Sequence, residues 1–105
     1  MAALQSQPTL ANLQQFIEDT VTERGWTRSP AELMLLLTEE VGEVAKAIRK
    51  EMELGAKKPE NTDHLAEELV DVLNYVLDIA NRYDIHMEHA FQTKWQKNAT
   101  RTWDD

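Results

Sequence analysis

Apolar residues recur at helical spacing through most of the chain, and turn-forming residues separate the apolar runs. The first run extends from Thr9 to Arg24, and Gly25 follows it as an expected helix end. The segment Ser29-Pro30-Ala31-Glu32 has the spacing of a capping box, with proline at the first helical position. These features predict one helix over residues 9–24 and a second from Pro30 to about Leu54.

Two further helices are predicted after the polar segment at residues 55–62. The third begins near Thr62 or Asp63, and Asp84 is the expected cap of a fourth that ends near Asn98. No alternation of apolar and polar residues favours a strand. The pattern therefore predicts an all-α, four-helix bundle-like fold with short connections.

Length and composition describe one domain over residues 1–105, in which residues 1–8 are expected to be a loose tail. The formal net charge of −8 argues against binding to nucleic acid, which needs a basic surface. The absence of cysteine excludes disulfides and thiolate metal sites. No apolar run is long enough for a membrane span and no signal peptide is recognisable, so we expect a cytoplasmic protein with no membrane contact.

Some apolar residues of the second and third helices fall outside one narrow stripe. They are Met34, Leu35, Val70 and Leu77. This breadth predicts a subunit interface in addition to the core, although scattered surface residues are the alternative.

Carboxylates interrupt the apolar run of the second helix. At about 100° per residue, Glu40 projects near the centre of the apolar face defined by Leu33, Leu37 and Val44. Glu43 lies three residues on and points to the same side. Two carboxylates in such a position need more compensation than a single hydrogen bond provides.

The third helix repeats this arrangement. Residues 67–71 match residues 39–43 in position, 28 residues later, and the two helices are expected to be antiparallel neighbours. Four carboxylates could then converge, and an all-oxygen site of this charge suits Mg²⁺, with Mn²⁺ as a substitute. The predicted ligands are Glu40, Glu43, Glu68 and Asp71.

Two other interpretations of the acidic residues are open. A di-iron centre normally needs Glu-x-x-His on two helices, and none of the three histidines follows a glutamate at that spacing. The acids could instead form a solvated face or ion pairs with Lys46, Arg49 and Lys50. The position of Glu40 within the apolar sector disfavours that second interpretation.

The two acidic motifs resemble those of the MazG-like all-α nucleoside triphosphate pyrophosphohydrolases. That family carries Glu-Glu-x-x-Glu followed by Glu-x-x-Asp. Here the first motif spans Glu39–Glu43, and the second spans Glu68–Asp71 after a gap of 24 residues. The likeness extends from Arg24 to Arg101. It implies Mg²⁺-dependent hydrolysis of (deoxy)nucleoside triphosphates to the monophosphate and pyrophosphate, as nucleotide-pool house-cleaning.

The resemblance also implies roles for individual residues. Glu40, Glu43, Glu68 and Asp71 would hold the metal, and Glu39 would be a further ligand or the base that orients the attacking water. Glu39 and Glu40 are thus the expected catalytic residues. The expected substrate-binding residues are Lys94, Lys97, Asn98 and Arg101 for the phosphates, and Tyr75 and Trp26 for the base.

The chain departs from the dCTP pyrophosphatase-like branch at two places. That branch has a histidine before the proline that opens the second helix, where this chain has Arg28-Ser29-Pro30. It also has a tryptophan a turn or so after the first acidic motif, which is missing here, where Lys50 stands at about that position. The base preference is therefore open. The resemblance further implies a homodimer or a tetramer made of dimers. The alternative function is a non-catalytic, acidic helical interaction module.

Overall fold

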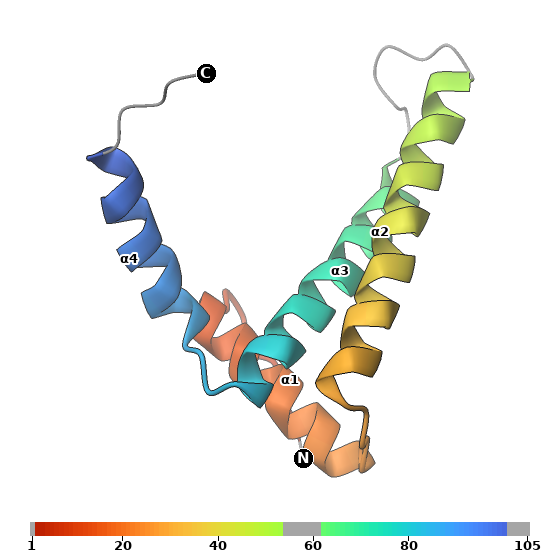
Figure 1. The fold of residues 1–105 in the computed structure, drawn as a ribbon. Helices are drawn as coiled ribbons and strands as arrows, with labels where there is room; N and C mark the ends of the chain where they lie inside the picture. The colour runs from red at the N-terminus through yellow and green to blue at the C-terminus, as the bar shows by residue number, and fades with distance from the viewer. Residues whose placement is uncertain (1, 54–61, 101–105) are drawn as a thin grey trace.

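The computed structural model describes residues 2–53 and 62–100, which form four α-helices (Figure 1). The helices are α1 (Leu10–Arg24), α2 (Pro30–Glu53), α3 (Asp63–Arg82) and α4 (Met87–Ala99). No strand occurs within these two ranges, so the predicted all-α, four-helix fold is confirmed. The predicted polar turn lies outside the described residues except for Thr62.

Both ends of α1 follow from local chemistry. The Asn12 amide donates to the Thr9 hydroxyl at 3.1 Å, and the Thr9 amide donates to the Asn12 side chain at 3.0 Å, which forms a capping box. Gly25 ends the helix in the left-handed region, with φ of 67°. A glycine suits this position because it has no Cβ to clash there. The predicted end of the first helix is confirmed.

The start of α2 at Pro30 is also confirmed. The Glu32 amide donates to the Ser29 hydroxyl at 3.2 Å, and that hydroxyl donates to the Glu32 carboxylate at 3.2 Å. Proline is favoured at the first helical position because its missing N–H would have had no helical partner. The described part of the helix ends at Glu53.

The prediction that Asp84 caps α4 is wrong. His86 is the residue before the helix, and Asp84 has φ of 53° in the left-handed region. Aspartate tolerates this conformation better than most residues. The turn lets the Ile85 amide donate to the Ala80 carbonyl at 2.9 Å, so Asp84 serves the end of α3 instead.

The central helix is α3. It packs along α2 as an antiparallel neighbour and also contacts α1, whereas α4 packs against α1 and diverges from the α2–α3 pair (Figure 1). The buried apolar residues lie mainly on α2 and α3: Leu33, Ala47, Leu77 and Ala80. The prediction that Leu77 lies outside the core is wrong. This residue is only 1% exposed, because α3 has two neighbours, α2 and α1.

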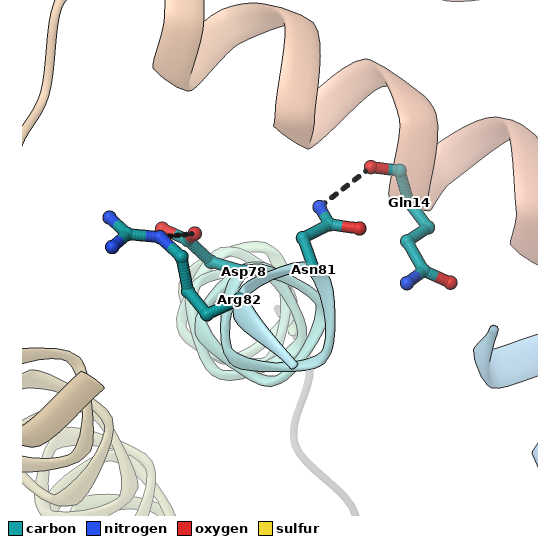
Figure 2. Close-up of polar contacts among 4 residues, drawn as sticks. All are labelled: Gln14, Asp78, Asn81 and Arg82. Atoms are coloured by element: carbon teal, nitrogen blue, oxygen red, sulfur yellow. Dashed lines mark hydrogen bonds and ion pairs between the residues drawn. The ribbon is translucent and has the colours of Figure 1, made fainter. Parts of the chain in front are cut away.

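Gln14 fixes the connection between α3 and α4 to α1. Its side chain donates to the Ile85 carbonyl at 2.6 Å and accepts from the Met87 amide at 3.0 Å. Asn81 donates from its side chain to the Gln14 carbonyl at 3.1 Å (Figure 2). Because Gln14 is buried and each of these groups is paired, this network sets where α4 begins.

Large apolar side chains remain exposed on three helices. Leu35 is 68% exposed and Val70 53% exposed, as the prediction of a subunit interface requires. On α4 the rings of Phe91 and Trp95 stack with centroids 6.4 Å apart, and both are exposed. None of the helices in the described part of the chain has the length and apolar character needed to cross a membrane.

Candidate active site

Three carboxylates from two helices meet between α2 and α3. Glu40 comes from α2, and Glu68 and Asp71 come from α3. One carboxylate oxygen of each lies within 4.8 Å of the others. We call these three residues the carboxylate cluster. They converge because the two acidic motifs occupy facing sides of antiparallel helices.

The electrostatics of the cluster show that its charges repel one another. The pKa of Glu40 is raised above its ordinary value, first by burial and then by a hydrogen bond with Glu68 and the negative charges of Asp71, Glu68 and Glu43. A divalent cation among these oxygens would reverse that effect. The donor set contains only carboxylate oxygens, which fits hard cations such as Mg²⁺ or Mn²⁺.

The other acidic residues of the predicted site lie at its margin. Glu43 is exposed and is not among the three converging carboxylates, although its charge contributes to the raised pKa of Glu40. Glu39 is exposed on the adjacent side of α2. The assignments of Glu43 as a ligand and of Glu39 as a ligand or base stay predictions.

His64 is a neighbour of the cluster that sequence reasoning missed. Its Nε2 atom lies 3.6 Å from a carboxylate oxygen of Glu68, one helical turn away. The signal was present in the sequence, since residues four apart on a helix face each other. The spacing rule for di-iron sites did not detect it, because in this chain the histidine precedes the glutamate.

A cavity of about 370 Å³ adjoins the cluster and lies between α1, α2 and α3. Glu40 and Asp71 form part of its wall, so the cluster opens directly into it. The opposite wall comes from apolar side chains of α1, including Phe16 and Val21. Tyr75, predicted to contact the base, also lines this cavity.

Trp26 lines the same cavity, and two guanidinium groups lie over its ring. The Cζ atom of Arg24 lies 5.4 Å from the ring centroid, and that of Arg28 lies 5.3 Å from it. Such cation–π contacts hold the indole in one orientation. Both aromatic residues that the family resemblance indicated therefore line the cavity beside the carboxylate cluster.

The predicted phosphate-binding residues are placed differently. Lys94, Lys97 and Asn98 lie on α4, which packs against α1 and diverges from the helices that carry the cluster (Figure 1). The side-chain oxygen of Asn98 is buried and has no hydrogen-bond partner among the described residues. Arg101 lies outside the described residues. Within one chain, α4 does not bring these groups to the cavity.

Four polar residues of the cavity wall escaped the sequence reasoning. They are Thr20, Arg28, Asn74 and Asp78. Asn74 and Asp78 follow Asp71 by three and seven residues, so the helical period alone places them on one side of α3. What the sequence did not show was that α1 closes a cavity over this side.

Comparisons with known proteins agree with this architecture. The model of the MazG nucleotide pyrophosphohydrolase domain matches residues 28–103. Rat (Rattus norvegicus) dCTP pyrophosphatase 1 is 33% identical over 101 residues, which cover 90% of this chain and 59% of the rat protein. The uncharacterised protein YvdC of Bacillus subtilis is 29% identical over 101 residues, covering 88% of this chain and 94% of YvdC.

A solved structure has the same fold. It is that of the Bacillus subtilis protein YPJD, a proposed pyrophosphatase, with a TM-score of 0.72 and 30% identity, covering 93% of this chain and all of YPJD. The chain spans less than two thirds of the length of the dCTP pyrophosphatases that it matches. The domain match nevertheless includes both acidic motifs and extends over most of the sequence. This chain belongs to the MazG family of nucleotide pyrophosphohydrolases.

Proposed function

We propose that this chain hydrolyses (deoxy)nucleoside triphosphates to the monophosphate and pyrophosphate, with Mg²⁺ as cofactor. One observation carries the proposal: Glu40 and Asp71 belong both to the carboxylate cluster and to the wall of an aromatic-lined cavity. A nucleoside in the cavity would present its α-phosphate to the cluster. The similarity to dCTP pyrophosphatase 1 supports a deoxynucleotide as substrate.

The carboxylate cluster is the proposed metal site. Glu40, Glu68 and Asp71, with Glu43 beside them, would hold Mg²⁺, and Mn²⁺ would substitute. When bound, such a cation neutralises phosphate charge and lowers the pKa of a coordinated water. This role also answers how a chain with a net charge of −8 can accept a polyanionic substrate.

The protein's own groups position the reactants. Glu39 lies next to Glu40 on α2, where it would orient the attacking water as a base or complete the ligand set. Tyr75 and Trp26 would pack against the base or the sugar within the cavity. Because the cavity wall from α1 is mostly apolar, it would limit the access of bulk water to the nucleoside.

A second copy of the chain would complete the site. Lys94, Lys97 and Asn98, with Arg101, are proposed to contact the β- and γ-phosphates. Their helix diverges from the carboxylate cluster in one chain, so we propose a homodimer or a tetramer of dimers in which α4 of one subunit reaches the cluster of another. The exposed apolar residues of α2, α3 and α4 support such an assembly. Nucleotide-pool house-cleaning in the cytoplasm is the proposed setting.

Incubation with separate deoxy- and ribonucleoside triphosphates and Mg²⁺ tests the function. We expect pyrophosphate without free orthophosphate, loss of activity with EDTA, and recovery with Mg²⁺ or Mn²⁺. Asp71→Asn should be inactive, whereas Asp19→Asn, at an exposed position of α1, should behave as the wild type. If no nucleotide is hydrolysed and Mg²⁺ does not stabilise the protein, the non-catalytic interaction module is the better assignment.

A further inference from the structure

A buried acid lies in the wall of the cavity beyond the carboxylate cluster. The side chain of Asp78 is on α3, and the residue is only 8% exposed. Asp78 forms an ion pair with Arg82, whose Nε lies 3.6 Å from a carboxylate oxygen (Figure 2). A carboxylate has about four acceptor positions, and one long ion pair satisfies few of them. Acceptor capacity therefore remains for a ligand.

Burial of the charged carboxylate of Asp78 costs the folded state free energy, because the charge loses its hydration. It raises the pKa of Asp78, although the nearby charges of Arg82 and Arg28 lower it. An apolar residue at this position would avoid the cost of burying a charge. It could pack between helices, because α3 is in contact with α1. The position is thus better suited to contact with a bound molecule than to packing.

The register of α3 relates Asp78 to the metal site. Asp71, Asn74, Tyr75 and Asp78 line the cavity at positions i, i+3, i+4 and i+7 of one helix side. Seven residues of helix rise by about 10 Å. That is close to the reach of a nucleoside from its α-phosphorus to the far edge of its base. With the α-phosphate at Asp71, the base edge would lie near Asp78.

We propose that Asp78 determines base specificity by accepting a hydrogen bond from the exocyclic amino group of a nucleobase. The assignment rests on the proposed function. Cytosine and adenine present an amino group beside a ring nitrogen acceptor, whereas thymine and uracil flank their one N–H with two carbonyl oxygens. A carboxylate attracts the first kind of edge and repels the oxygens of the second.

Arg28 supplies the complementary donor. Its Cζ atom lies over the Trp26 ring, 5.3 Å from the centroid, and its charge acts on Asp78, so Arg28 links the aromatic and acidic parts of the cavity. Arginine only donates hydrogen bonds. It therefore pairs with a ring nitrogen or carbonyl acceptor next to the amino group. The substrate class is a nucleoside triphosphate with an amino-bearing base.

The test separates recognition of a base from a purely structural role. Asp78→Asn keeps the size of the side chain and replaces one acceptor by a donor. Arg82→Gln is the matched control, because it breaks the same ion pair, leaves the carboxylate in place and alters a residue outside the cavity wall. Each variant is assayed with dCTP, dATP, dTTP and dUTP, at a pH well above the titration range of carboxyl groups.

For Asp78→Asn we expect kcat/KM for dCTP relative to dTTP to fall by about tenfold or more, with dTTP and dUTP unchanged or improved. Arg82→Gln should leave this ratio as in the wild type. An equal fall for all four substrates, or the same change of ratio in both variants, would overturn the proposal. Circular dichroism confirms that each variant is folded.

Binding of the products gives a readout that does not need turnover. The dissociation constants of dCMP, dAMP and dTMP are measured calorimetrically in EDTA, and Asp78→Asn should weaken only the first two. If the wild type hydrolyses no nucleotide, the proposed function fails, yet these constants still test Asp78. Suppose that the wild type is active. If Asp78→Asn then binds each product as tightly as the wild type does, and its ratio of kcat/KM for dCTP to that for dTTP is unchanged, only the specificity assignment fails.

Discussion

Replacing Glu40 by glutamine should stabilise the metal-free protein while abolishing its activity. The substitution keeps the shape of the side chain and removes one of three charges whose oxygens lie within 4.8 Å of one another. The raised pKa of Glu40 has burial as its largest cause and the neighbouring carboxylates as further ones. Both causes disappear with a neutral amide.

The size of the effect follows from that separation. Two unit charges at 4.8 Å repel by about 0.9 kcal/mol when water screens them fully, and Glu40 has two such neighbours. Since Asp71 is exposed and can turn away, we expect a net stabilisation of about 1 kcal/mol. In a domain of this size, that raises Tm by about 4–8 °C.

Thermal unfolding followed by circular dichroism measures this change. In EDTA at low ionic strength and neutral pH, Glu40→Gln should melt above the wild type, and added salt should reduce the difference. In Mg²⁺ at a hundredfold excess over Kd, the wild type gains about 2.7 kcal/mol that the variant lacks, so the order reverses. Glu39→Gln is the matched control: it removes the same charge from the same helix outside the carboxylate cluster, and should shift Tm less.

The pH dependence gives an independent check with a defined sign. Because the folded pKa of Glu40 lies above its ordinary value of 4.5, the folded state binds the proton more tightly than the unfolded state. Its contribution to the free energy of unfolding therefore grows as pH falls through the folded pKa and is complete below 4.5. The stability of the wild type relative to Glu40→Gln should rise over that interval. A lower Tm for Glu40→Gln in EDTA, or equal shifts for both variants, would refute this account of the cluster.

Three further predictions concern the assembly and the fold. Glu40→Gln and Lys97→Ala should each be inactive, but an equal mixture after subunit exchange should recover about a quarter of the wild-type activity, because mixed dimers contain one intact site; no recovery would place both residues in the site of one chain. Gln14→Leu should lower the free energy of urea unfolding by about 2–3 kcal/mol, since it leaves the Ile85 carbonyl and the Met87 amide unpaired; an unchanged value would show that water replaces the side chain. Gly25→Ala should lower the same free energy by about 1 kcal/mol, because its φ of 67° is strained for alanine, and a neutral result would contradict the role of that turn.

Local signals predicted the helices well where one residue type had one structural use. The proline after Ser29 fixed the start of α2, and Gly25 fixed the end of α1. The prediction that Asp84 caps α4 failed because aspartate suits both a helix N-cap and a left-handed turn. The choice between these depends on Gln14, which binds the Met87 amide from a helix 73 residues earlier in the chain. A local pattern does not contain that contact.

The carboxylate cluster was predictable in part for a similar reason. Both motifs lie on or at the edge of the apolar face of their helix, and antiparallel neighbours bury these faces against each other, so Glu40, Glu68 and Asp71 could be grouped from sequence. The cavity could not, because its shape depends on how α1 crosses α3. The helical period fixes which residues share a side, but not which helix covers that side. The sequence therefore places Asp78 on the same side of α3 as Asp71, but it does not show that this side lines a cavity.

Helix α1 contributes both to the cavity and to the position of α4. Its apolar side forms a wall of the cavity through Phe16 and Val21, and its Gln14 holds the turn from which α4 begins. A helix moves as a rigid rod over so short a distance, so the width of the cavity and the direction of α4 cannot be adjusted separately. If α4 makes the contact between subunits, then whatever nucleotide fills the cavity also biases the assembly. Linkage makes this reciprocal, and nucleotide affinity should then depend on protein concentration.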